Sequence, residues 1–423
     1  MSQAITVDGE SIRHHGWRVT FAGMGINLAL GVLYTWSVIS KRVPEDWGWS
    51  EVARSLPYSV ACLVFSLVMV PAGRMQDRVG PRLVATIGGI LVGIGMIGAY
   101  FTTTPIGYVI TIGVLAGAGI GFGYASATPP AVKWFSKAKT GLIAGIVVSG
   151  FGLASVYAAP AAKWLIGLKG LPFTMMVFGV GFLIIVVALA QLLKAPPAGY
   201  VPPDQPPVPA VNNNKKEDFL PREMLRTWQF YVLWFMYACG AGAGLMIIAK
   251  MDPIASDQAK LTLGFLLVAV LAVGNGAGRI LAGMLSDKIG RKATMFICFV
   301  LQAAAIGLLS QATPGSTLAT VPMLTILAAV IGANYGANLS LFPSITKDYY
   351  GLKNFGMNYG LVFTAWGVGG FMLALLAGKV YDATKSFDFA YFTASGLLIL
   401  AAITVFFVKA PHHEVPSAPP DGA

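Results

Sequence analysis

The sequence predicts an all-α membrane protein of twelve transmembrane helices in two pseudosymmetric six-helix halves. Three observations predict this fold class: the composition is strongly apolar, long apolar runs recur along the chain, and one loop motif occurs twice. Apolar residues make up 56% of the 423 residues and charged residues 11%, against about 25% charged residues in soluble domains. Such a chain is expected to lie in lipid. Basic loops between spans explain its net charge of +11 better than nucleic acid binding does.

The apolar runs are long enough for twelve spans of about 20 residues each. We predict these spans at 17–40, 52–73, 83–104, 106–129, 141–164, 171–193, 228–249, 260–284, 292–313, 320–344, 356–379 and 388–408. If both termini are cytoplasmic, 19 of the 29 Lys and Arg residues lie on the inner side and nine on the outer side. This bias follows the positive-inside rule. We therefore expect a multi-pass protein of the cell (inner) membrane with both termini in the cytoplasm.

The middle of the chain differs in character from the spans. Residues 194–226 contain eight prolines, three consecutive asparagines and mixed charges, which is typical of a poorly ordered linker. We predict four regions: an N-terminal six-helix half at 1–193, a cytoplasmic linker at 194–226, a C-terminal six-helix half at 227–410 and a cytoplasmic tail at 411–423. Small residues in the fourth span are expected to let helices approach closely, namely Gly113, Gly117, Gly119, Gly121 and Gly123.

One loop motif is repeated in the two halves. Residues 73–82 read GRMQDRVGPR and residues 283–292 read GMLSDKIGRK, so that glycine, acid, base and glycine recur at an offset of 210 residues. This pair of loops resembles the signature of the major facilitator superfamily, in which two six-helix halves enclose a substrate site near the bilayer midplane. The resemblance implies the major facilitator fold. It also implies a role in closing the cytoplasmic side for four residues: Asp77, Arg78, Asp287 and Lys288.

Arg279 is the one ionisable residue that lies deep within a predicted span. It precedes Asp287 by eight residues, which is about 12 Å along a helix and places it near the midplane. An arginine at that depth costs about 2.5–3.5 kcal/mol. No Asp or Glu lies within a predicted span, beyond its first residue, to neutralise it. Three cations at span ends are expected to reach the interface instead: Lys250, Lys379 and Arg54.

An unneutralised guanidinium at the midplane is expected to face a polar cavity or an anionic ligand. Its planar fork suits a carboxylate. Asn275 lies one turn earlier on the same helix face, where it would steady Arg279 or bind a second polar group of the substrate. The alternative is that Arg279 hydrogen-bonds helix carbonyls and joins the two halves.

Several stretches resemble oxalate/formate antiporters and bacterial monocarboxylate transporters. They read GVLYTWS at 31–37, KWF at 133–135, EMLRTWQFYVLW at 223–234, LFP at 341–343 and NYG at 358–360. The overall resemblance is greatest to a bacterial monocarboxylate (lactate-type) transporter. It implies that the arginine of the eighth span binds the substrate carboxylate and that aromatic residues shape the cavity. We expect the substrate site to comprise Arg279, Asn275, Tyr34, Tyr124, Tyr335, Leu28, Phe151 and Trp366.

Two departures from these relatives bear on the substrate. Oxalate carriers place a lysine in the eleventh span where this chain has Trp366, and a second carboxylate left unpaired would be costly. We therefore expect a monocarboxylate such as lactate, pyruvate or acetate. Animal monocarboxylate transporters have an aspartate at the position of Asn275 and a lysine in the first span, and both are missing here.

These departures leave the proton site open. We expect proton-coupled symport by alternating access, with the proton travelling with the substrate or on a gate acid such as Asp287. The alternatives are exchange of one carboxylate for another and a carboxylate sensor that does not transport.

Other functional classes are less well matched by the residues. The four histidines lie in the tails, and the three cysteines are dispersed among apolar runs, which favours neither a metal site nor a disulfide framework. We find no nucleophile with a base and no phosphate-binding loop. An anion channel would use rings of charge, whereas one buried arginine is present. We expect a monomer that is not an enzyme, that binds a small carboxylate, H+ and lipid, and that needs no metal, cofactor or nucleic acid.

Overall fold

The computed structural model describes residues 6–7, 10–135, 140–197, 200–202, 218–351 and 354–411, without the side chains of 6, 7, 10–14, 77, 140 and 141. Most of the predicted linker and tail lies outside these ranges, and so does the side chain of Asp77. The predicted region boundaries therefore stay predictions.

The first part of the chain forms helices after two short antiparallel strands. Its elements are β1 (Thr6–Val7), β2 (Glu10–Ser11), α1 (Ile12–Leu30), η1 (Gly31–Thr35), α2 (Trp36–Lys41), η2 (Glu45–Trp47), α3 (Glu51–Val79), α4 (Pro81–Tyr100), α5 (Pro105–Tyr108), η3 (Val109–Ala116), α6 (Gly117–Lys133) and α7 (Thr140–Ala190).

The second part is also helical wherever it has regular structure in the described ranges. Its elements are α8 (Pro221–Met224), α9 (Trp228–Pro253), η5 (Ile254–Gln258), α10 (Gly264–Ile289), α11 (Arg291–Leu308), η6 (Leu309–Gln311), η7 (Thr317–Ala319), α12 (Val321–Tyr350), α13 (Phe355–Thr384) and α14 (Asp388–Thr404).

The described residues contain twelve membrane-spanning helical segments. Ten helices are long and apolar enough to cross a bilayer. One of them, α7, consists of two consecutive helices joined at Lys169 and Gly170, whose backbone is non-helical. The shorter apolar helix α14 is the twelfth segment. The number of spans predicted from the sequence is thus recovered, and the protein is a multi-pass membrane protein.

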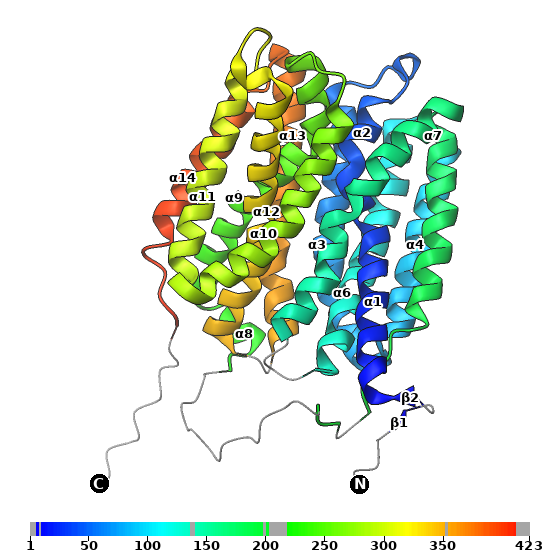
Figure 1. Ribbon diagram of the computed structural model, residues 1–423, viewed down its shortest axis with the longest axis vertical. Coiled ribbons are helices and arrows are strands. Elements are labelled where there is room, and N and C mark those ends of the chain that lie inside the picture. The colour runs from blue at the N-terminus through cyan, green and yellow to red at the C-terminus, as the bar shows by residue number, and fades with distance from the viewer. Residues whose placement is uncertain are drawn as a thin grey trace.

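The helices are arranged in two groups that stand side by side (Figure 1). We call α1 to α7 the N-terminal group and α9 to α14 the C-terminal group. They meet mainly where α13 packs on α3 and α10 packs on α7. Strands β1 and β2 and helix α8 lie at one end of the bundle, which we call the terminal end, and the opposite end is the distal end (Figure 1).

The repeated loops have the same backbone geometry in both groups. Gly80 follows α3 with φ +92°, and Gly290 follows α10 with φ +90°. Glycine adopts this region without the steric cost that a side chain imposes. Each glycine therefore ends one membrane helix and begins the next.

The glycines of the fourth span act as the sequence predicts. A Cβ on Gly119 would lie 2.6 Å from the carbonyl oxygen of Gly88, and a Cβ on Gly117 would lie 2.9 Å from the Cα of Ala61. The absence of side chains therefore allows α6 to touch the backbones of α4 and α3.

Several membrane helices extend beyond their predicted spans. Helix α3 begins at Glu51 rather than at 52, and α9 runs to Pro253 rather than to 249. Glu51 and Asp252 are therefore acids within membrane helices, contrary to the expectation that the spans contain none. Both lie near the distal end, away from Arg279.

Candidate functional site

Close contact between α10 and α12 sets the position of Arg279. A Cβ on Gly278 would overlap the carbonyl of Ala333, and a Cβ on Gly336 would overlap the carbonyl of Asn275. Glycine at these points lets the two backbones touch. Asn275 lies at this contact with α12, whereas Arg279 extends to α7 of the N-terminal group.

Arg279 is buried at the boundary between the two groups, with 5% of its surface exposed. Its Nη1 donates to the carbonyl oxygen of Val148 in α7 at 2.8 Å, and its Nε donates to Oδ1 of Asn275 at 3.1 Å. Gly152 of α7 also faces the guanidinium, since a Cβ there would lie 3.4 Å from Nη2. The bond to Val148 is the kind of contact that the alternative interpretation of Arg279 expects.

Two buried donors at this site make no well-formed hydrogen bond in the described part of the chain, although the hydroxyl of Tyr124 lies close to the guanidinium. They are Nη2 of Arg279 and Nδ2 of Asn275. No ion pair neutralises Arg279 among the described side chains. A buried donor without a partner costs about 1–3 kcal/mol, and more when it is charged. The two residues lie one helical turn apart on α10.

A chain of hydrogen bonds joins the two groups next to Arg279. Tyr34 of η1 and Tyr335 of α12 share a hydrogen bond of 2.5 Å between their hydroxyls, and Nε1 of Trp366 in α13 donates to the Tyr335 hydroxyl at 2.8 Å. All three side chains are buried. The chain therefore ties η1 to α12 and α13.

Close packing of η1 against α7 positions Tyr34. A Cβ on Gly31 would overlap the carbonyl of Phe151, so glycine is required where η1 interrupts the first membrane helix. A 3-10 stretch within a helix often marks a hinge or a strained sequence. The sequence predicts one continuous span here and does not reveal this interruption.

Tyr124 and Phe151 complete the aromatic wall beside the guanidinium. Phe151 lies edge-on to Tyr34 at 4.9 Å and to Tyr124 at 5.4 Å between ring centroids. The positive charge of Arg279 acts on the hydroxyls of Tyr34, Tyr124 and Tyr335. Seven of the eight predicted substrate residues are thus brought together.

Leu28 is the eighth predicted residue, and no described contact joins its side chain to the others. It is half-buried in α1. Its carbonyl accepts a hydrogen bond from the Tyr157 hydroxyl at 3.0 Å. Its predicted substrate role stays a prediction.

Two aromatic residues of the cluster are missing from the sequence prediction. Phe65 of α3 lies 5.0 Å from Trp366 and 5.3 Å from Tyr124, and Phe363 of α13 stacks on Trp366 at 5.2 Å. Phe363 precedes Trp366 by one turn, which is a usable signal. Phe65 has no signal that separates it from an ordinary core residue.

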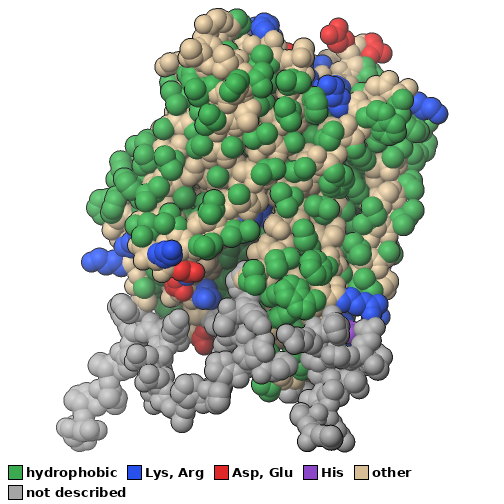
Figure 2. Space-filling view, in the orientation of Figure 1, with side chains coloured by type: hydrophobic (Ala, Val, Ile, Leu, Met, Phe, Trp, Pro, Cys, Tyr) green, Lys and Arg blue, Asp and Glu red, His purple; other side chains and the backbone are tan. Residues whose placement is uncertain are grey.

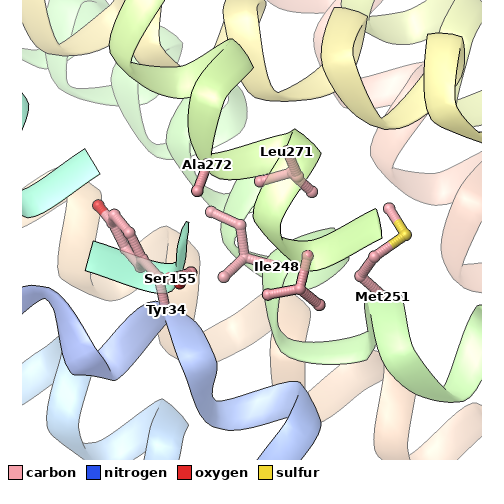
Figure 3. Close-up of a pocket in the computed structure, with 7 residues that line it drawn as sticks. Tyr34, Ser155, Ile248, Met251, Leu271 and Ala272 are labelled. Carbon is pink, nitrogen blue, oxygen red and sulfur yellow. The ribbon is translucent and has the colours of Figure 1, made fainter. Parts of the chain in front are cut away.

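The space around the site differs between the two ends. On the distal side, a gap lined by Tyr34, Ser155, Ile248, Met251, Val268, Leu271 and Ala272 separates the groups and is too narrow to hold water (Figure 3). Toward the terminal end, the visible face is hollowed between the two groups (Figure 2). The site is therefore closed distally.

Only some residues of the repeated loops form ion pairs in the described structure. Asp287 is mostly exposed and pairs with Arg291 at 2.7 Å, and Arg291 also pairs with Asp348 of α12 at 3.2 Å. Arg78 and Lys288 are exposed. The described partner of Asp287 thus lies at the start of α11, while the predicted gating role stays untested.

The expectation that Lys250 and Arg54 reach the membrane interface is wrong. Lys250 is 2% exposed and donates to Glu51 at 2.7 Å. Nη1 of Arg54 donates to the carbonyl oxygen of Ser40 at 2.9 Å. Both cations turn inward because acceptors lie close to them in the fold. Lys379 is exposed, as expected.

Comparison with known proteins identifies the relatives of this chain. The family profile of the Major Facilitator Superfamily matches residues 19–269 and 242–422. The oxalate:formate antiporter of Oxalobacter formigenes is 28% identical over 90% of this chain and 86% of its own length. The uncharacterized MFS-type transporter YhjX of Escherichia coli is 28% identical over 84% of this chain and 85% of its own length. Monocarboxylate transporter 12 of Homo sapiens is 24% identical over 86% of this chain and 74% of its own length. These relatives agree with the resemblance found in the motifs.

A solved structure shares the fold. It is a bacterial homolog of the human lysosomal transporter Spinster in an inward-facing, unoccupied conformation. The TM-score is 0.68 over 93% of this chain and 96% of that one, at 15% sequence identity. At this identity the match concerns the fold alone.

Proposed function

Because the chain belongs to the Major Facilitator Superfamily, we propose that it is a secondary active transporter of small monocarboxylates, of the lactate or pyruvate type, that works by alternating access. In this proposal it lies in the cell (inner) membrane with its terminal end in the cytoplasm, acts as a monomer and is not an enzyme.

The observation that carries this proposal is the pair of buried donors without partners on α10. Nη2 of Arg279 and Nδ2 of Asn275 are both enclosed and unsatisfied in the described structure. A carboxylate offers two oxygens and one negative charge, so it would accept from both donors and neutralise the guanidinium. The aromatic side chains of Tyr124 and Phe151 would contact the small apolar part of the substrate.

The surroundings of Trp366 support a monoanion rather than a dianion. Its Nε1 is committed to the Tyr335 hydroxyl, and its ring stacks on Phe363. No second cation pairs with this site among the described side chains. A second carboxylate would therefore be desolvated without a partner, which is costly.

Neutralisation of Arg279 provides a physical basis for alternating access. Arg279 belongs to α10 of the C-terminal group, and Val148, which it contacts, belongs to α7 of the N-terminal group. A bound carboxylate removes the unpaired charge from the boundary along which the groups move. The loaded carrier can then change conformation at lower electrostatic cost than the empty one.

The loop acids are proposed to act at the cytoplasmic end of this cycle. Asp287, Arg291 and Asp348 join α10, α11 and α12 through exposed or half-exposed ion pairs. Such pairs contribute little to stability and can exchange partners when the groups move. We assign the same role to Asp77, Arg78 and Lys288 by the repeat.

Carboxylate exchange is the second candidate function. It is favoured by the similarity to the oxalate:formate antiporter and by the unpaired guanidinium, which would oppose the return of an empty carrier. A sensor on the same fold would bind the carboxylate without moving it.

Purified protein in liposomes separates these functions. Uptake of labelled lactate driven by an inside-alkaline pH gradient, with no internal substrate, would support symport. Uptake only after preloading would support exchange, and saturable binding with no flux in either case would support a sensor. Failure of mono- and dicarboxylates to bind at all would refute the assignment of Arg279 and Asn275.

A further inference from the structure

The first membrane helix changes its winding at the level of the substrate site. Between α1 and α2, the five residues of η1, Gly31–Thr35, form a 3-10 helix and are all buried. The segment ends at Thr35 with φ −88° and ψ 0°, whereas an α-helix has ψ of about −42°. A 3-10 stretch in the middle of a helix often marks a hinge, and this one carries Tyr34 of the substrate site.

The faces of η1 have different surroundings. Side chains three residues apart share a face in a 3-10 helix, so Gly31 and Tyr34 lie on one face. That face is in close contact, because a Cβ on Gly31 would overlap a backbone carbonyl of α7, and the Tyr34 hydroxyl bonds to that of Tyr335 in α12. Val32 and Leu33 lie on the other side of η1, toward the interior of the N-terminal group.

An internal apolar cavity of about 20 Å³ lies next to Val32 and Leu33. Trp36 and Ile39 of α2 also line it, and the remaining walls belong to α4, η3, α6 and the second half of α7. The one polar group among the lining side chains, Nε1 of Trp36, already donates to the carbonyl oxygen of Arg54 at 2.9 Å. The cavity is large enough for one water molecule but offers it no polar partners, so we expect it to stay dry. It therefore leaves room beside the hinge.

The opposite wall of the cavity is irregular and adaptable. The π-helix η3 contributes Ile112 and Ala116 to it, and π-helical turns are rare and occur frequently at functional sites. Met96 of α4 and Met175 of α7 also line the cavity, and methionine side chains adapt to spaces of irregular shape. Two irregular helices thus line one cavity, whose walls can follow a movement of η1.

We propose that η1 is a hinge in the first membrane helix, which converts from the 3-10 to the α form when the distal side opens and uses this cavity as the room for that movement. The inference rests on the proposed transport function and adds a movement within one group to the movement of the two groups. In the closed structure, the hydrogen bond between Tyr34 and Tyr335 holds η1 in the 3-10 form.

Helix geometry gives the size of the movement. A 3-10 helix turns about 120° and rises about 2.0 Å per residue, whereas an α-helix turns about 100° and rises about 1.5 Å. Conversion of all of η1 therefore shortens the first membrane helix by about 2.5 Å and turns α2 by about 100° relative to α1. Because α2 packs on α9 of the C-terminal group, the contact between the two groups changes with it.

This movement needs room on the cavity side. Trp36 and Ile39 line the cavity, and the rotation of α2 moves both side chains across it. The same rotation withdraws Tyr34 from Tyr335, since each converted residue turns the chain by about 20°. Movement toward α7 is blocked, because Gly31 already touches its backbone. A filled cavity should therefore hold η1 in the 3-10 form.

The test measures a distance within the N-terminal group, which a rigid-body movement of the two groups leaves unchanged. Spin labels are attached to cysteines at Lys41, the last residue of α2, and at Phe101, an exposed residue directly after α4. A second labelled pair, Asp46 and Thr317, has one exposed distal residue in each group and reports the distal opening. Pulsed electron paramagnetic resonance records both distances in lipid nanodiscs without any carboxylate. All chains have alanine in place of the three buried native cysteines, Cys62, Cys239 and Cys298.

The variant Tyr335→Phe releases the hinge, because it lacks the hydroxyl that bonds to Tyr34. We expect a second population of the distance between Lys41 and Phe101, together with a longer distance between the labels of the second pair. A rotation of about 100° displaces the tip of a side chain about 5 Å from the helix axis by about 8 Å, which sets the upper limit of the shift. An unchanged distance between Lys41 and Phe101 in this variant would overturn the hinge, whether or not the groups separate.

Two changes in the cavity wall test its role in opposite directions. Ala116→Val fills part of the cavity and should lower the shifted population of Tyr335→Phe by about fivefold or more. Met96→Ala enlarges the cavity and should raise that population, because the hinge gains room. The controls are the same changes at exposed positions outside the cavity, Ala188→Val in α7 and Met372→Ala in α13.

The outcomes of these variants separate the hinge from the transport function. Equal shifted populations in the cavity variants and their controls would overturn the role of the cavity. If Ala116→Val fails to fold, Met96→Ala and its control decide the question alone. No measurement uses lactate, so the hinge can fail while transport is observed in liposomes, and transport can fail while the hinge moves.

Discussion

Replacing Arg279 by lysine tests the central claim about the site. The guanidinium uses Nε for Asn275 and Nη1 for Val148, and it retains Nη2 without a described partner. A lysine keeps the charge but concentrates its donors on one nitrogen. Arginine has three separate nitrogens for the Asn275 oxygen, the Val148 carbonyl and a carboxylate. The single nitrogen of lysine cannot occupy all three positions. At least one charge-assisted hydrogen bond is therefore lost.

The magnitude follows from that lost bond. A hydrogen bond to a charged group contributes about 1.5–3 kcal/mol, and 1.4 kcal/mol is a factor of ten in affinity. Arg279→Lys should weaken lactate binding by about 10- to 150-fold. Isothermal titration calorimetry on the purified protein measures the affinity, and uptake into liposomes measures the transport that follows from it.

The control is Arg222→Lys, the same change at an exposed position in α8, which should leave both values unchanged. Thermal unfolding separates a role in binding from a role in structure. If Arg279 only joined the two groups, Arg279→Lys would lower the unfolding temperature and leave the lactate affinity unchanged. Lactate affinity within twofold of the parent would refute the reasoning.

Three further changes test other parts of the structure. Gly336→Ala would force α12 away from the Asn275 carbonyl and should destabilise the protein by about 1–3 kcal/mol, measured by thermal unfolding. Gly283→Ala, where a Cβ meets nothing within 4 Å, is its control, and equal effects would contradict the close-packing argument. Tyr335→Phe removes the hydroxyl that ties the groups together and should shift spin-label distances toward an open distal end; unchanged distances would exclude a role in closure. Asp287→Asn breaks an exposed ion pair worth about 0–1 kcal/mol, so it should slow lactate uptake with little change in unfolding temperature, and normal uptake would argue against gating.

The family match and the shared fold confirm the twelve-helix architecture and the superfamily predicted from the sequence. Apolar runs of membrane length, the basic loops and the repeated GxxxD motif are local properties, and they depend on the bilayer rather than on distant contacts. Arg279 could be singled out for the same reason, because a cation deep in an apolar run is costly wherever the helix lies. The monocarboxylate preference and the proton coupling stay proposals.

The tertiary structure alone decided which charges meet. Lys250 and Glu51 are 199 residues apart in the chain, and Arg42 and Asp252 are 210 apart, so sequence spacing does not pair them. The position of Lys250 near a span end suggested exposure to the interface, yet the packing of the two groups encloses its side chain. Likewise, Tyr34 and Tyr335 share a hydrogen bond only because the groups meet at that level. The number of spans and the unneutralised cation within one of them could be predicted from the sequence, because both depend on the energy of each segment in lipid. Which partners surround that cation, and which end of the route is closed, depends on contacts between distant helices and was decided only by the fold.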